Sequence, residues 1–160
     1  MRVKLRLTQK DHAVLRDHLL PGDGLEAVAV ALCGRRRSKT RHCLTVRTVV
    51  PIPYDECKVR TAESVTWSTQ RLIPILEDAG RRDLAILKIH SHPGGYTKFS
   101  SVDDDSDADL FNSVFGWTDS AYPHASAIML PGGRMFGRAA MPDGSFEPLD
   151  SILVPGNDLK

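Results

Sequence analysis

An apolar run from Leu84 to Ile89 is soon followed by Pro93 and Gly94-Gly95, and this order constrains the fold more than any other part of the sequence. The run has the length and composition of a buried strand. Proline ends the strand because it lacks a backbone N–H, and the two glycines let the chain turn. Ser100 or Ser101 can then cap a helix that continues to about Val114. The sequence therefore predicts a strand, a turn and a helix in succession.

Apolar periodicities elsewhere predict further strands and helices around this unit. Thr8 can cap a helix that runs toward Leu20. A second helix, kinked at Pro74, is expected to run from near Thr61 to Gly80. Strands are expected at Arg2–Leu7, Leu25–Leu32 and Leu44–Ile52, and a hairpin at Ala125–Leu130 and Met135–Met141. These elements predict a mixed α/β layer structure.

Length and composition indicate one globular domain. The 160 residues are 41% apolar and 26% charged, near the average for globular proteins. The longest apolar run, Ala27–Cys33, is far shorter than the roughly 20 residues that cross a bilayer, and the basic N-terminus lacks the apolar segment of a signal peptide. The three cysteines, Cys33, Cys43 and Cys57, include no Cys-x-x-Cys pair, so we expect small buried side chains and no cysteine zinc site. We therefore expect a cytoplasmic protein outside the membrane.

Positive charge is concentrated in Arg35–Arg41, although the net charge of the chain is only +1. A basic segment can bind an acidic partner, but a solvated loop between two paired strands is the favoured interpretation. Nucleic-acid binding is not expected from this loop, because no interleaved aromatic residue or basic face accompanies it. Residues 1–150 form the predicted domain. Residues 151–160 follow no element pattern and are interpreted as a tail or the start of a linker to a further module.

His90 and His92 follow the predicted strand directly and can form part of a metal site. Residues i and i+2 of a strand lie on the same side, so both imidazoles can face one point. Asp103 falls in the first turn of the next predicted helix, where its carboxylate can face the histidines. Two neutral imidazoles and one carboxylate leave the fourth position of a tetrahedral zinc ion to water, as in catalytic zinc sites.

Each of these residues also has a plainer interpretation. A His-x-His pair on its own is better explained as two strand-end histidines. The aspartates after Asp103 are favoured near a helix N-terminus by the helix macrodipole, so we interpret them as a solvated face: Asp104, Asp105, Asp107 and Asp109. The histidine pair, proline, serine and aspartate occur together in one register, and this combination favours the metal site.

The spacing of these residues resembles the JAMM, or MPN-plus, signature of zinc metalloproteases, which reads His-x-His, seven residues, Ser, two residues, Asp. The fixed positions are matched by His90, His92, Ser100 and Asp103. The family also has a glutamate upstream on an early strand, and Glu26, which opens an apolar segment ending at Gly34, resembles it. Glu56 and Glu63 are alternatives, but both fall in or beside a predicted loop or helix start, where an acidic residue serves capping or solvation.

The resemblance, in particular to the prokaryotic JAB-domain branch of this family, implies a fold, a cofactor and a reaction. The implied fold is a JAB/MPN domain, which is cytidine-deaminase-like, with a central mixed β-sheet flanked by helices. The implied cofactor is Zn²⁺ bound by His90, His92 and Asp103. Glu26 would act as the general base, and Ser100 would donate a hydrogen bond to the developing oxyanion. The implied reaction is hydrolysis of a peptide or isopeptide bond.

The expected substrate is a ubiquitin-like protein or its conjugate, cleaved after the C-terminal glycine. A site at a strand end, fronted by Gly94-Gly95 and beside a sheet edge, suits such an extended glycine-rich tail. One alternative is the release of a small amine or amino acid from a sulfur-carrier protein. Another is a noncatalytic MPN-type scaffold, since family members without the ligands act as scaffolds. A ubiquitin-activating-type ThiF module is a further expected partner.

Overall fold

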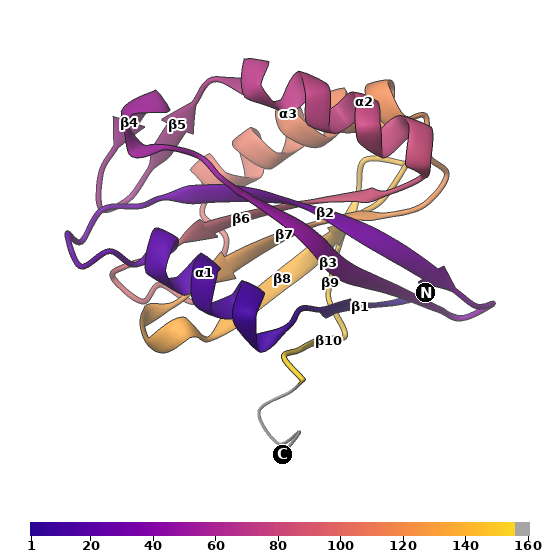
Figure 1. Cartoon of the computed structure of the whole chain (residues 1–160), viewed down its shortest axis with the longest axis horizontal. Helices are drawn as coiled ribbons and strands as arrows, with labels where there is room; N and C mark the ends of the chain where they lie inside the picture. The colour runs from indigo at the N-terminus through magenta and orange to yellow at the C-terminus, as the bar shows by residue number, and fades with distance from the viewer. Residues whose placement is uncertain (156–160) are drawn as a thin grey trace.

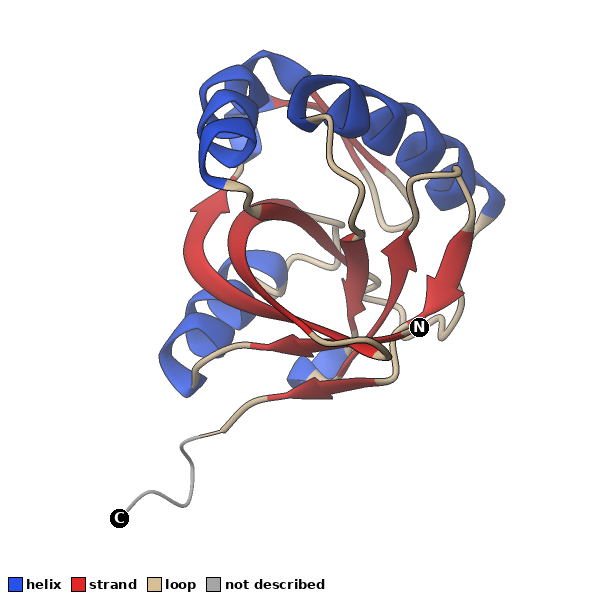
Figure 2. Ribbon diagram, turned by 90° about the vertical axis from the view of Figure 1, so that its right-hand side faces the viewer, coloured by secondary structure: helices blue, strands red, loops and turns tan. Residues whose placement is uncertain are grey.

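The computed structural model describes residues 1–155 and has one curled sheet with helices on both faces (Figures 1 and 2). The strands of this sheet are β1 (Arg2–Arg6), β2 (Val28–Arg37), β3 (Arg41–Pro51), β6 (Ala85–Ser91), β7 (His124–Met129), β8 (Met135–Ala140), β9 (Phe146–Pro148) and β10 (Ser151–Leu153). They lie in the order β10-β1-β3-β2-β6-β7-β8-β9. A separate two-stranded sheet consists of β4 (Cys57–Arg60) and β5 (Val65–Trp67). The predicted mixed α/β fold is confirmed.

Three α-helices cover the large sheet: α1 (Gln9–Leu19), α2 (Leu72–Arg82) and α3 (Ser101–Thr118). Short 3₁₀ turns occur at Tyr54–Glu56, Thr69–Arg71 and Pro131–Gly133. In Figure 1, α2 and α3 lie side by side above one face of the sheet, and α1 lies below the other. Within residues 1–155, none of the helices has the length and apolar character that crossing a bilayer requires.

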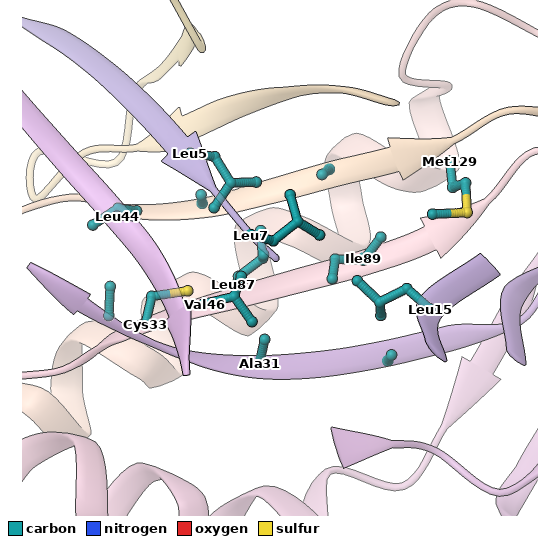
Figure 3. Packing of buried hydrophobic residues seen from close by; sticks show 14 of the residues in the cluster. Leu5, Leu7, Leu15, Ala31, Cys33, Leu44, Val46, Leu87, Ile89 and Met129 are labelled. Carbon is teal, nitrogen blue, oxygen red and sulfur yellow. The ribbon is translucent and has the colours of Figure 1, made fainter. Parts of the chain in front are cut away.

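Two apolar clusters fill the space between the helices and the sheet. Because side chains alternate along a strand, β2 directs Val28 and Val30 into the cluster beneath α2 and α3, and Ala29 and Ala31 into the cluster on the α1 side. Figure 3 shows the second cluster, where Leu15 of α1 lies beside Ile89 of β6. Leu5, Leu44 and Leu87 belong to the same cluster. All of these side chains are buried.

Strand β6 lies in the interior of the large sheet, as expected for its apolar sequence. It pairs with β2 in the antiparallel direction and with β7 in the parallel direction, and each of its residues is buried. The strand ends at Ser91, and the N–H of Gly95 then donates to the carbonyl oxygen of His92 at 2.9 Å, which closes a turn through Pro93. Gly95 has a φ of +85°, a conformation that favours glycine. This turn directs the chain from β6 toward α3.

The expected helix from Thr61 to Gly80 is wrong in its first half. Residues 57–67 instead form the β4–β5 hairpin, and α2 begins only at Leu72. Pro74 is then the third residue of α2, in the first turn, where its missing N–H removes no helical hydrogen bond. A helix from Thr61 would have placed Pro74 in its interior. At the other end, α2 passes Gly80 and stops where Asp83 adopts a left-handed conformation with a φ of +51°.

Two segments that the sequence left without an element contain strand residues. The expected basic loop Arg35–Arg41 is shorter than predicted, because β2 continues through Arg37 and β3 begins at Arg41. Ser151–Leu153, expected to be tail, form β10 and pair with β1 in parallel. Ile152 packs against the apolar cluster on the α1 side, which explains why this segment pairs. Residues 156–160 of the expected tail lie outside the described residues, and their interpretation as a linker stays a prediction.

Candidate metal centre

Three potential metal ligands meet where β6 ends and α3 begins. His90 lies on β6, His92 follows the end of that strand, and Asp103 lies in the first turn of α3. Each offers one ligand atom, and these atoms all lie within 4.8 Å of one another. All three residues are buried, although each is polar or charged. The structure therefore brings together the three residues that the sequence indicated as ligands.

The spacing of the ligand atoms fits one metal ion. The Nε2 atoms of His90 and His92 are 3.2 Å apart, and each lies 3.0 Å from an oxygen of Asp103. Tetrahedral zinc with bonds of about 2.0–2.2 Å separates neighbouring ligand atoms by about 3.3–3.6 Å. The observed distances are a few tenths of an ångström shorter. A small outward movement of the side chains would accommodate the ion.

The hydrogen-bond partner of His92 determines which of its ring nitrogens faces Asp103 without a hydrogen when the ring is neutral. Its Nδ1 lies 2.8 Å from the carbonyl oxygen of Tyr96, which can only accept, so Nδ1 carries the hydrogen. In the neutral ring, Nε2 then has a lone pair that faces the carboxylate of Asp103. Two atoms without a hydrogen repel each other at 3.0 Å, so either a proton or a metal ion must lie between them. A carbonyl partner on the far nitrogen is typical of histidines that bind metals.

The electrostatics of the cluster favour a charged carboxylate and a neutral His90. Burial alone would raise the pKa of Asp103, but its contacts with the rings of His90 and His92 outweigh burial and hold the pKa of this carboxyl far below its usual range. Burial lowers the pKa of His90. Burial opposes protonation of His92 as well, but its contacts with Asp103 and the carbonyl of Tyr96 raise its pKa overall. The donor set is thus one carboxylate and two imidazoles, which is a set that suits zinc.

Ser100, one of the two serines that the sequence offers as caps, is the N-cap of α3. Its Oγ accepts a hydrogen bond from the N–H of Asp103 at 3.1 Å, and Asp103 Oδ2 accepts one from the N–H of Ser100 at 2.9 Å. These two bonds form a capping box. The oxygen of a serine hydroxyl can accept while its hydrogen donates elsewhere. Capping therefore leaves the Ser100 O–H free to donate.

Glu26 lies just before β2 and beside the histidines. Val28 pairs with His90 in the antiparallel register, so continuing that register by two residues places Glu26 opposite His92. Its backbone is fixed on both sides, because its N–H donates to Thr61 at 2.7 Å and its carbonyl accepts from Arg60 at 2.7 Å. The residue is only 3% exposed, and burial raises the pKa of its carboxyl to about 7.

The other two glutamates considered for this role differ from Glu26 in their surroundings. Glu56 forms an ion pair with Arg71, which lowers the pKa of its carboxyl. Glu63 is exposed in the turn between β4 and β5. Neither residue is buried, whereas Glu26 is. Of these three glutamates, Glu26 is the one that is buried and lies beside the candidate ligands.

Ser91 joins the strands that carry the site. Its Oγ accepts from the N–H of Ala27 at 3.0 Å, and its own N–H donates to the carbonyl of Ala27 at 3.1 Å. The side chain points away from the histidines, as the alternation along the strand predicts. Ser91 thus fixes the segment that holds Glu26 against the one that holds His92.

A buried charge network next to the cluster was not predicted. The expectation that Asp107 belongs to a solvated face is wrong, because this residue is fully buried and accepts from Lys88 at 2.7 Å and from Arg138 at 2.8 Å. Arg138 also lies over the ring of Phe99, 3.7 Å from its centre. The network links β6, α3, β8 and the loop before Ser100. The sequence feature that indicates this network is Lys88, because a lysine within an apolar strand requires a buried partner of opposite charge.

Comparisons with known proteins agree with this fold. A family model described as prokaryotic homologs of the JAB domain matches residues 8–140. The solution structure of protein DSY2949 from Desulfitobacterium hafniense is similar with a TM-score of 0.60 and 18% sequence identity, over 94% of this chain and 92% of that one. A sequence comparison with curated proteins gives no match. The family match covers β2, β6 and the start of α3, and so includes each residue of the candidate centre.

Proposed function

The chain belongs to the family of prokaryotic homologs of the JAB domain, and we propose that it is a zinc-dependent hydrolase of peptide or isopeptide bonds. One observation carries the proposal: His90, His92 and Asp103 converge on one point beside a buried carboxyl group, that of Glu26. A bound zinc ion supplies a Lewis acid for the scissile carbonyl and lowers the pKa of a water ligand to about 7. Side chains of this chain would supply the proton transfer and the stabilisation of the oxyanion.

Glu26 is proposed to move the proton. A general base works best when its pKa is near the operating pH, because it must both accept and return the proton. Burial brings the pKa of Glu26 to about 7, which meets this condition. In the proposed reaction its carboxylate takes a proton from the attacking water and delivers it to the leaving amine. Its fixed backbone keeps the carboxyl group on the same side of the sheet as the histidines.

Ser100 is proposed to stabilise the developing oxyanion. Its oxygen already accepts from the N–H of Asp103, so its hydroxyl hydrogen is available to the substrate. Removing a single donor of this type costs roughly 10²–10³ in kcat in other hydrolases. The capping box holds the Ser100 backbone at a fixed position relative to the ligand Asp103, which supports a preorganised donor.

The proposed substrate is the C-terminal tail of a ubiquitin-like protein, cut after its terminal glycine. The expectation of a neighbouring sheet edge needs one revision, because β6 lies inside the large sheet. The proposed edge is instead that of the β4–β5 sheet, whose connecting turn contacts the backbone of Glu26 through Thr61. An extended tail can add main-chain hydrogen bonds to such an edge. A ThiF-type module stays a predicted partner.

The test of this proposal uses two substrates. The zinc-loaded protein is incubated with a ubiquitin-like protein whose C-terminal glycine carries either a lysine-linked partner or a single amino acid, and the products are measured by mass spectrometry. Cleavage of the lysine-linked conjugate supports the proposal. Cleavage of the single amino acid alone would favour the sulfur-carrier alternative. Cleavage of neither substrate by protein that holds zinc would contradict the proposal and favour a noncatalytic scaffold.

A further inference from the structure

Positive charge is segregated onto one part of the large sheet. Strands β1, β2 and β3 contain no aspartate or glutamate, although the net charge of the whole chain is only +1. Acidic residues concentrate elsewhere, most densely in α3. The three strands are neighbours in the sheet, in the order β1-β3-β2. Figure 1 shows β1 and β10 at the part of the sheet that lies away from α2 and α3.

The strand register places the cations of these strands on one face. On β1, Val3 and Leu5 point into the core, so the alternate residues point outward. Arg2 lies beside Arg41, and on β2 Arg36 lies beside Cys43, which itself neighbours Lys4. We call the set the basic face: Arg2, Lys4, Arg6, Arg36, Arg41 and Arg47. All are exposed except Lys4, which is half-buried.

Arg47 belongs to this face although a bulge shifts the register between β2 and β3. A Cβ added to Gly34 would lie 2.5 Å from the Arg47 guanidinium, so this side chain crosses directly over Gly34. Gly34 lies two residues from Arg36 and therefore on the same side of β2. Glycine at this position makes room for the arginine. Arg35 and Arg37 are not included, because both lie near Asp83 at 3.6 Å.

We propose that the basic face binds the phosphate backbone of duplex nucleic acid without sequence preference. Five of its six cations are arginines, and the planar guanidinium group of arginine can donate two hydrogen bonds to phosphate oxygens. Along a strand, cations at i and i+2 are about 6.8 Å apart, and neighbouring strands are about 4.8 Å apart. The face is thus a regular array of single-sign charge. Contacts of this type to phosphates give affinity but no sequence readout.

The composition of the face disfavours an acidic protein as the partner. Protein interfaces usually have an apolar or aromatic centre from which charge is depleted. Within residues 1–155, the large exposed apolar side chains lie on other elements, apart from Met1 before β1 and Leu153 at the end of β10. The face also lacks aromatic side chains on which the bases of a single strand could stack. Both absences favour a duplex held by its backbone.

The basic face is separate from the candidate metal centre. Arg36 lies near one end of β2 and Glu26 just before the other, and a strand of this length spans on the order of 30 Å. Nucleic-acid binding can therefore be tested on the chain irrespective of its metal content or hydrolytic activity. Failure of this proposal would leave the proposed function untouched, and the reverse also holds.

The test measures the affinity for two labelled duplexes of unrelated sequence by fluorescence polarisation between 50 and 200 mM salt. If all six cations contact phosphates, log K falls with log salt with a slope of about −5, so affinity drops by about 10³ over this range. Both duplexes should bind equally. The triple variant Arg2→Gln, Lys4→Gln, Arg6→Gln should reduce the slope by about 3. A second triple variant, Arg36→Gln, Arg41→Gln, Arg47→Gln, should do the same.

The matched control removes as much charge from other elements. Lys58→Gln, Arg81→Gln, Arg134→Gln neutralises three exposed cations outside the basic face and should leave the slope unchanged. Circular dichroism verifies that each variant is folded. Equal slopes for the control and both basic-face variants would overturn the proposal, because global charge would then explain binding. Binding to poly-glutamate or to phosphatidylserine vesicles, without binding to either duplex at 50 mM salt, would also overturn it.

Discussion

Ser100 and Asp103 each hold the other's backbone at the start of α3. The Ser100 Oγ accepts from the N–H of Asp103, and Asp103 Oδ2 accepts from the N–H of Ser100. The same Asp103 oxygen lies 3.0 Å from Nε2 of His92. The capping box that begins the helix therefore also positions a candidate metal ligand. Helix formation and assembly of the centre are coupled through this one pair.

Substituting Ser100 tests this coupling through stability. Ser100→Ala removes the side-chain acceptor, so the free energy of unfolding should fall by about 1 kcal/mol. Ser100→Thr keeps the hydroxyl and should lose much less. Urea unfolding of the metal-free protein measures both variants. Equal stability of Ser100→Ala and the original protein would show that the cap contributes nothing.

Glu26→Gln should retain zinc and lose most hydrolysis. The substitution removes the proposed proton acceptor but leaves His90, His92 and Asp103 in place. Metal content and the rate of substrate cleavage are measured on the same sample. Glu63→Gln is the matched control, since this exposed glutamate lies nearby in the β4–β5 turn, and it should cleave at the original rate. Normal cleavage by Glu26→Gln would assign the proton transfer to another group.

Asp107→Asn should destabilise the fold strongly. The change leaves the buried cation Lys88 without its counter-charge and removes one of the two acidic partners of Arg138. Breaking a buried ion pair in this way costs about 3–5 kcal/mol, and we expect a loss of that order here. Asp104→Asn is the control, because Asp104 also pairs with Arg138 but its side chain is 57% exposed. Its cost should be below about 1 kcal/mol. Thermal or urea unfolding compares the two, and equal losses would contradict the importance of the buried network.

Stability should fall as the pH drops below about 6.5, because two buried histidines are held neutral. Burial, with smaller effects of nearby cations, lowers the pKa of His124 to about 3 and that of His42 to about 4. Unfolded histidine titrates near 6.5. Between these values the unfolded chain binds protons and the folded chain does not. Each histidine should therefore reduce the free energy of unfolding by about 1.4 kcal/mol per pH unit below 6.5.

His124→Asn isolates one of these contributions. The Nδ1 of His124 accepts from the N–H of Ile86 at 2.8 Å, and an asparagine oxygen can replace this acceptor without titrating. Urea unfolding at a series of pH values should show that the difference between the variant and the original protein shrinks as the pH falls from 6 to 4. Parallel curves over this range would contradict the assigned neutral His124.

The sequence predicted most strands and the convergence of the ligands, because both depend on local patterns. A strand that ends in His-x-His-Pro places His90 and His92 on one side, and a cap before Asp103 places the carboxylate in a first helical turn. The β4–β5 hairpin was missed because Val65, Leu72 and Leu76 have near-helical spacing, although Val65 belongs to β5 and the two leucines to α2. Periodicity alone does not show where one element stops.

Features that depend on distant parts of the chain could not be predicted from local patterns. Strand β10 forms by pairing with β1, which lies at the other end of the sequence. The local sequence around Asp107 predicts a solvated side chain. Its partners, Lys88 of β6 and Arg138 of β8, are distant in the sequence and meet it only in the folded chain. The basic face likewise emerges only from the pairing of three strands, since the segment Arg35–Arg41 by itself resembles a solvated loop.

Metal content tests the central claim most directly. Elemental analysis of protein purified without chelator or added metal should give one zinc per chain, and the double variant His90→Ala, His92→Ala should give none. His124→Asn is the matched control and should retain zinc, because His124 lies outside the ligand cluster. A chain that binds no zinc, or a double variant that retains it in full, would contradict the assignment of His90, His92 and Asp103 as a zinc centre.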